Sequence, residues 1–390
     1  MTGGPANRRA LFVVACLGML TFGIVLTTLG AVLPSLVERF GIGKADAGAL
    51  FLLMSFGILV GSLVFGPIVD RRGYRGMLLL AIGCIALGLE GIALAPTLGW
   101  LRAAVALIGV GGGIVNGGTN ALVADVSPER SAGLALLGVF FGVGAVGVPF
   151  ALALLLDRFS YAALIAGVGA LVLVPLAVTA ATRFPAPKLA QGFPLADAGR
   201  LLRDPVLLLM GLMLFLESGM EIAVGGWTAT FVQEELGLGD RRALVLLSLY
   251  WLGMMLARLA LGWLLRRAAP ARVLLGCIGV GLVGALLLVG TASVAAAAAG
   301  VFLLGCGFAA TFPVVLGFVG DRYARLSGTA FSVVIVMALT GGMLLPYTTG
   351  ALGAVYGLRG SFLLIPAALL LLAVLLLVVT RRLAAQPRPA

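Results

Sequence analysis

The chain contains no histidine and four cysteines, and only 11% of its 390 residues are charged. The cysteines all lie within apolar runs, so we expect small core residues rather than disulfides or metal ligands. Neither a GxxxxGK phosphate loop nor an HExxH metal motif occurs in the sequence. These absences exclude an ATP-driven pump and a histidine-dependent enzyme, and we expect no catalytic site, metal or cofactor.

The low charge content also excludes an ordinary soluble domain, in which about 25% of residues are charged. Hydrophobic residues make up 62% of the chain, and its mean hydropathy is +1.18. A helix crosses a bilayer with roughly 20 apolar residues, and uncharged runs of that length recur along the chain. The sequence therefore predicts an all-α membrane protein with twelve transmembrane helices. They are expected near residues 10–36, 46–69, 76–95, 101–124, 131–154, 160–182, 206–233, 243–265, 272–290, 294–319, 327–352 and 359–380.

The net charge of +11 does not indicate nucleic-acid binding, because the basic residues cluster in alternate short loops. The segments on the side of the two termini hold 18 Lys and Arg, against 7 in the opposite loops. Basic loops stay in the cytoplasm, so the sequence predicts cytoplasmic termini in a multi-pass protein of the bacterial inner membrane. The expected partners are the bilayer and a small-molecule substrate, and the protein is expected to be a monomer.

The longest polar interval, residues 183–205, is rich in proline and glycine and is predicted to be a cytoplasmic linker. It separates a six-helix bundle at 1–182 from a second bundle at 206–390. Landmarks of the first half recur 196 or 197 residues later, which predicts two pseudo-symmetric, parallel repeats. The matched pairs are Gly57 and Gly253, Gly66 and Gly262, Gly109 and Gly305, Gly111 and Gly307, Asp125 and Asp321, Gly144 and Gly341, and Pro149 and Pro346.

Between the second and third predicted helices the chain reads GPIVDRRGYR, residues 66–75. Gly66 permits close helix packing, and Asp70 can cap a helix end or pair with a facing arginine. Arg71 and Arg75 can anchor the loop at the cytoplasmic surface. The segment resembles the loop signature G-x-x-x-D-R-x-G-x-R/K of the major facilitator superfamily. This resemblance implies substrate binding between two six-helix bundles, and a loop that latches the outward-open state. The second-half copy, GWLLRR at 262–267, lacks the aspartate, which predicts a weaker latch.

Within that superfamily the sequence resembles the fucose–galactose–proton symporter group and its bacterial glucose relatives. Four segments carry the likeness: residues 111–125, 136–149, 217–227 and 250–262. The resemblance implies transport of a sugar coupled to a cation. The first helix departs from the group's pattern, because it offers only Thr21, Thr27 and Thr28 where an acidic residue would stand.

Two carboxylates, Glu217 and Glu221, stand near the middle of one predicted helix, four residues apart and therefore on one face. Two such groups in a low dielectric cannot easily both be ionised unless a cation sits between them. They are the predicted site of proton or sodium coupling. The alternative is that one binds sugar hydroxyls while the other braces a helix. Arg258 could neutralise a glutamate of this pair or serve in an inner gate.

The predicted substrate contacts are polar or aromatic. Asn116 and Asn120 share a helix face, and their amides offer the donors and acceptors that vicinal hydroxyls require; asparagine also mediates helix packing in membranes. Trp227, Tyr250 and Trp251 could stack on a sugar ring, although tryptophan near a helix end also anchors helices at the membrane interface. Glu221 is counted with this substrate set as well.

These features predict a secondary active transporter that moves a small polar solute, such as a hexose, by alternating access and coupled to H⁺ or Na⁺. A proton-driven exporter of drugs or other small molecules with the same fold is the alternative. The threonine-only first helix and the apolar helix surfaces leave room for it.

Overall fold

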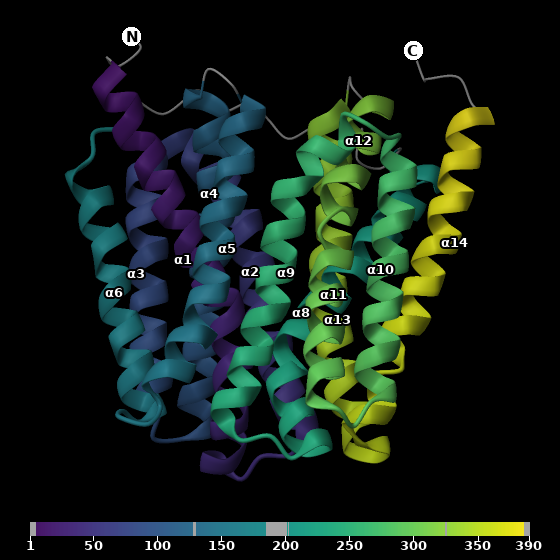
Figure 1. The fold of residues 1–390 in the computed structure, drawn as a ribbon. Coiled ribbons are helices and arrows are strands. Elements are labelled where there is room, and N and C mark those ends of the chain that lie inside the picture. The colour runs from purple at the N-terminus through teal and green to yellow at the C-terminus, as the bar shows by residue number, and fades with distance from the viewer. Residues whose placement is uncertain (1–4, 128–129, 185–200, 202, 324–325, 386–390) are drawn as a thin grey trace. The chain divides into compact units, whose positions relative to one another are not determined.

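The computed structural model describes residues 5–127, 130–184, 201, 203–323 and 326–385, which are folded into α-helices joined by short loops (Figure 1). Twelve spans in these ranges are long and apolar enough to cross a membrane, which confirms the predicted all-α membrane class. The helices are α1 (Pro5–Phe40), α2 (Lys44–Arg72), α3 (Tyr74–Ala93), α4 (Leu98–Val126), α5 (Arg130–Leu155), α6 (Tyr161–Ala181), α8 (Pro205–Leu236), α9 (Asp240–Leu265), α10 (Pro270–Gly290), α11 (Val294–Phe308), α12 (Thr311–Arg322), α13 (Ser327–Ser361) and α14 (Leu364–Ala385).

Contacts along the chain divide it into two compact units. Unit 1 comprises Met1–Gln191 with Gly239–Ser248, and unit 2 comprises Gly192–Leu238 with Leu249–Ala390. In unit 1, α4 packs against α1, α2 and α3, whereas in unit 2 the most extensive contact joins α8 to α13. Most of the predicted linker, residues 185–200 and 202, lies outside the described residues.

Two predicted helix ends differ from the structure. The sequence predicted a helix end near residue 352 and a new start near 359, but α13 continues to Ser361 and α14 begins at Leu364. The bend is at Gly357, whose φ of +74° lies in the left-handed region that favours glycine. The predicted span 294–319 is also broken, into α11 and α12. Pro313 has no N–H with which to continue the helical hydrogen bonds at that break.

Glycines bring helix backbones together at matching places in both units. In unit 1, a Cβ added to Gly57 would meet the carbonyl of Ala106, and in unit 2 one added to Gly253 would meet the carbonyl of Phe302. Both partners of the unit 2 contact, Gly253 and Phe302, stand 196 residues after their unit 1 counterparts, Gly57 and Ala106. The same holds for Gly109 against Met54 and for Gly305 against Tyr250. The internal repeat is therefore reproduced in individual contacts.

Candidate functional site

The two glutamates of α8 lie in unit 2 beside an arginine of α9. Glu217 is fully buried, and neither of its carboxyl oxygens has a hydrogen-bond partner among the described residues. The charged groups that act on it are the carboxylate of Glu221 and the guanidinium of Arg258. Arg258 Nη2 lies 3.4 Å from Glu221 Oε2, and the side chain of Glu221 is 12% exposed. The spacing of four residues thus places two carboxylates and one cation together inside one unit.

Aromatic side chains of α9 close one side of this cluster. Tyr250 is fully buried, and its hydroxyl donates a hydrogen bond to the backbone carbonyl of Glu221 at 3.1 Å. Its ring meets Trp251 edge-on, with centroids 5.0 Å apart. Trp251 in turn covers Gly225 of α8, where a Cβ would lie 2.7 Å from the indole ring. Both aromatics are core residues of unit 2, so they fix the backbone of α8 around Glu221.

Trp227 braces α8 against α13. Its indole N–H donates to the carbonyl of Pro346 at 3.0 Å, and the side chain is fully buried. A tryptophan that anchors a helix at the membrane interface must reach the lipid, so burial argues against that alternative for both Trp227 and Trp251. Neither residue offers a free face to a solute in this structure. The predicted substrate residues that keep exposed surface are Asn116, Asn120 and Glu221.

In unit 1 the predicted asparagines interact with each other along α4. The Asn120 amide donates to the backbone carbonyl of Asn116 at 2.8 Å and to its side-chain oxygen at 3.1 Å. Both side chains are partly exposed. The neighbouring Thr119 is fully buried and reaches Met19 of α1. Two amides on one helix face, with exposed surface left over, can still bind hydroxyl groups.

The threonines of α1 do not replace an acidic group. Thr21, Thr27 and Thr28 are fully buried, and each hydroxyl donates to the carbonyl of the residue four positions earlier. Such bonds satisfy the hydroxyl within its own helix. The described part of α1 therefore supplies no charged group in place of the acidic residue, and the charged groups of the candidate site are those of α8 and α9.

The signature loop is described only in part. Gly66, Asp70 and Arg71 fall within α2, but their side chains lie outside the described residues. Gly73 of the signature has φ +77° and links α2 to α3 directly, a conformation that favours glycine. Arg75 donates to the carbonyl of Ala180 at 2.6 Å. The loop is thereby tied to the end of α6.

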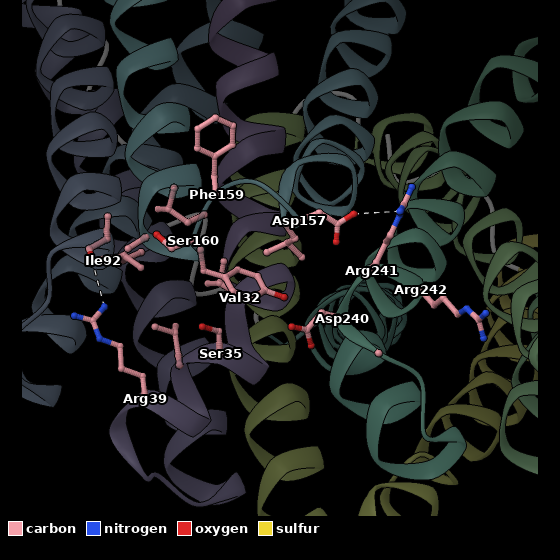
Figure 2. A pocket seen from close by; sticks show the side chains of 17 residues that line it. Val32, Ser35, Arg39, Ile92, Asp157, Phe159, Ser160, Asp240, Arg241 and Arg242 are labelled. Carbon is pink, nitrogen blue, oxygen red and sulfur yellow. Dashed lines mark hydrogen bonds and ion pairs between the residues drawn. The ribbon is translucent and has the colours of Figure 1, made fainter.

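A cavity of about 860 Å³ opens in unit 1 at the ends of α1 and α3 (Figure 2). The corner between α5 and α6 and the start of α9 complete its wall. Asp157 and Arg241 pair across it at 3.3 Å, and Tyr161 interacts with Asp240. None of the predicted substrate residues lines this cavity. This cavity could not be predicted from the sequence beyond the charges in short loops, because its wall comes from segments far apart in the chain.

An arginine caps the end of a helix in each unit. In unit 1, Arg39 donates to the carbonyls of Ala93 and Ala95 at 3.3 and 2.8 Å. In unit 2, Arg359 donates to the carbonyls of Val289 and Thr291 at 2.7 and 3.0 Å. Arg359 also pairs with Glu235, with Nε 3.1 Å from Oε2. These bonds satisfy carbonyls that a helix end leaves without partners. Neither arginine was predicted from the sequence to have a role at the site.

The chain belongs to the Major Facilitator Superfamily, whose family model matches residues 15–338 and 246–390. This match agrees with the twelve spans, the 66–75 signature and the repeated helix contacts. Homologues and structural neighbours are transporters, so the chain is a membrane transport protein rather than an enzyme.

Relatives by sequence are distant. The "Uncharacterized transporter y4wD" of Sinorhizobium fredii is 26% identical over 89% of this chain and 92% of its own length. A "Gallate transporter" of Pseudomonas putida is 25% identical over 69% of this chain and 68% of its own length. "Bypass of stop codon protein 6" of Saccharomyces cerevisiae is 25% identical over 66% of this chain, and the match spans 57% of that protein.

Solved structures show the same fold at lower identity. The nucleoside transporter NupG aligns with a TM-score of 0.79 at 14% identity, covering 96% of this chain and 99% of its own. A D-xylose-proton symporter aligns with a TM-score of 0.78 at 16% identity, covering 94% and 96%. These likenesses establish the major facilitator fold and leave the solute open.

Proposed function

We propose that the protein is a secondary active transporter that moves a small polar solute, such as a hexose, by alternating access and coupled to a cation. The observation that carries the proposal is Glu217, a fully buried carboxyl group without a hydrogen-bond donor, beside the Glu221–Arg258 pair. An ionised carboxylate in such a place costs several kcal/mol. Buried ionisable groups of this kind cluster at functional sites, where a change in their charge is part of the mechanism.

The coupling ion that fits this cluster best is H⁺. Two carboxylates and one guanidinium leave one negative charge in excess, and a single proton removes it. A sodium ion would need several oxygen ligands, yet one oxygen of Glu221 faces the guanidinium of Arg258 at 3.4 Å. The positive charge beside that oxygen disfavours a second cation.

The solute is expected to be small and rich in hydroxyl groups. The names of similar proteins mention gallate, 4-hydroxybenzoate, a nucleoside and D-xylose, all of which carry hydroxyl groups on a ring. Each unit keeps partly exposed polar groups that suit hydroxyl groups: the amides of Asn116 and Asn120 in unit 1, and the carboxylate of Glu221 in unit 2. The likeness to the fucose–galactose–proton symporter group supports a sugar. We place both termini in the cytoplasm of a bacterial cell, as the distribution of basic residues favours.

A small aromatic acid is the second candidate. Three of the curated relatives are named for gallate or 4-hydroxybenzoate transport. Arg258 stands within a membrane-spanning helix and could receive a carboxylate if it left Glu221. A drug exporter of the same fold would instead carry a lipophilic cation out of the cell, and sugars and aromatic acids would not inhibit this efflux.

The test is uptake by the purified protein in proteoliposomes. Labelled hexoses, xylose, nucleosides and gallate are offered with an imposed pH gradient, with and without sodium. We expect one hydroxylated solute to accumulate with the pH gradient alone. Glu221→Gln should abolish accumulation, because Glu217 and Arg258 then carry opposite charges and leave no excess negative charge for a proton to neutralise. Glu217→Gln, which mimics the protonated acid, should keep exchange of solute at equilibrium and lose accumulation.

The matched control is Glu234→Gln, the same change on the exposed end of α8, which should leave accumulation unchanged. Accumulation that follows sodium alone would overturn H⁺ coupling. If Glu221→Gln accumulates solute normally, the cluster has no part in coupling. Efflux of a lipophilic cation without uptake of any of these solutes would favour the exporter.

A further inference from the structure

The outer face of α9 carries an apolar stripe that ends in basic residues. Leu256, Leu259 and Trp263 are 45%, 55% and 49% exposed. Their spacing of three and four residues puts them on one face of the helix. On a membrane-spanning helix, an exposed apolar stripe of this kind is a surface on which lipid chains can pack. The stripe ends at the turn between α9 and α10 (Figure 1).

At that end an arginine is stacked on the last aromatic ring. The guanidinium carbon of Arg267 lies 4.1 Å from the centroid of the Trp263 ring. Stacking uses the face of the guanidinium and leaves its N–H edges free to bind oxygens. Arg266 and Arg272 beside it are exposed. Three exposed arginines therefore stand within seven residues of the chain at the end of the stripe.

This turn is the second copy of the signature loop. At an offset of 196 residues, Arg266 stands where the first copy has Asp70, and Arg267 where it has Arg71. The first copy thus balances one charge of each sign at these two positions, while the second carries two positive charges. The aspartate that could pair with a facing arginine is absent here.

We propose that the turn Trp263–Arg272 binds the headgroup of an anionic phospholipid. The phosphate accepts hydrogen bonds from Arg266 and Arg267, and Trp263 lies at the level of the glycerol. One acyl chain runs along Leu259 and Leu256. The stripe is what selects a lipid over a free phosphate ion, because it offers apolar surface continuous with the basic groups.

The test compares phosphatidylglycerol with phosphatidylcholine. The full-length protein is studied by native mass spectrometry for retained lipid, and in lipid nanodiscs for thermal unfolding. We expect retention of phosphatidylglycerol and a higher Tm in its presence. Removing both arginines in R266A/R267A should weaken retention by about fivefold for each arginine lost. Trp263→Leu should keep the apolar stripe and weaken retention by freeing Arg267.

The matched control is R381A/R382A, which removes two exposed arginines that are consecutive in the sequence at the end of α14. No aromatic ring of the described residues lies over them. Equal loss of phosphatidylglycerol in this variant would overturn the proposal, since any basic pair would then suffice. Equal stabilisation by inorganic phosphate in detergent would overturn it too, because no acyl chain would be needed. No preference between the two lipids would also overturn it.

Discussion

Matched positions of the two units carry different polar residues on the same helices. Where unit 2 has Glu221 and Arg258, unit 1 has Val25 and Ser62, 196 residues earlier. The serine hydroxyl donates to a backbone carbonyl of α4, that of Gly113, at 3.4 Å. Ser62 of unit 1 therefore makes a neutral bond from α2 to α4, while its counterpart Arg258 forms an ion pair from α9 to α8.

The reverse holds on α4 and its counterpart α12. Asn116 and Asn120 of unit 1 correspond to Phe312 and Leu316 of unit 2. The amides of unit 1 offer neutral hydrogen bonds, whereas Glu221 and Arg258 of unit 2 form an ion pair. The repeat thus preserves the backbone contacts and divides the polar groups between its two copies.

The largest effect is expected at the glycine contacts that the two units do not share. A Cβ at Gly61 or Gly113 would meet the backbone carbonyl of Val110 or Ile58. The matching residues of unit 2 are alanines, at 257 and 309. Gly61→Ala and Gly113→Ala should each lower the free energy of unfolding by about 2–3 kcal/mol, because the helices must separate.

Thermal and denaturant unfolding in detergent measures this loss. Alanine favours helix over glycine by about 1 kcal/mol, so a loss can come only from the contact. Gly276→Ala, at a site with nothing within 4 Å, should cause no loss. If Gly61→Ala is as stable as the parent, α2 and α4 tolerate the wider spacing that the alanines of unit 2 require.

An intermediate effect is expected at the helix-end arginines. Arg359→Ala removes the guanidinium partner of Glu235, which keeps the backbone N–H of residue 359, and it uncovers two carbonyls; we expect a cost of about 2 kcal/mol. Arg39→Ala uncovers two carbonyls only and should cost about 1 kcal/mol. Glu235 is the counterpart of Arg39 at the 196-residue offset. The double variant E235R/R359A should therefore recover most of the loss, because an arginine at 235 can reach the carbonyls as Arg39 does.

The measurement is again unfolding in detergent, with Arg359→Ala, Glu235→Arg and the double variant compared in one cycle. If the double variant is less stable than Arg359→Ala alone, an arginine at position 235 does not replace Arg359 at the two carbonyls.

The smallest effect concerns a tyrosine that bonds an aspartate in each unit. Tyr323 donates to Asp204 at 2.7 Å, and Tyr74 of unit 1 donates to Asp125 at the same distance. Burial, with the bond to Asp204 as a lesser cause, raises the pKa of Tyr323 above its usual range. A raised folded-state pKa means stability that is full below about pH 10, the ordinary tyrosine value, and lost as pH rises beyond it.

Tyr323→Phe should lower stability by about 1 kcal/mol at neutral pH and flatten this alkaline loss. Thermal unfolding between about pH 8 and pH 11 measures both effects. A parent protein whose Tm falls no faster than that of Tyr323→Phe over this range would contradict the assignment.

Much of this architecture follows from the sequence alone. Scarcity of charge predicts the spans, and recurring glycines such as Gly57 and Gly253 predict the repeat, because both are properties of local sequence. The spacing of Glu217 and Glu221 likewise predicts a shared face. The buried position of Trp227 and the role of Arg359 could not be predicted. Each depends on a partner more than 60 residues away, Pro346 and Val289 respectively.

The capping arginines have a consequence for how such repeats are compared. Aligned residue by residue, Arg39 stands opposite Glu235, a reversal of charge that would be scored as divergence. The helix-end carbonyls at Ala93 and Val289 nonetheless receive the same guanidinium group, from a different helix in each copy. The two copies therefore share the backbone carbonyls that need a hydrogen-bond donor, whereas the arginine that donates comes from α1 in one copy and from α13 in the other. Searches for the common ancestry of such halves will find more by comparing unsatisfied backbone groups than by comparing side chains.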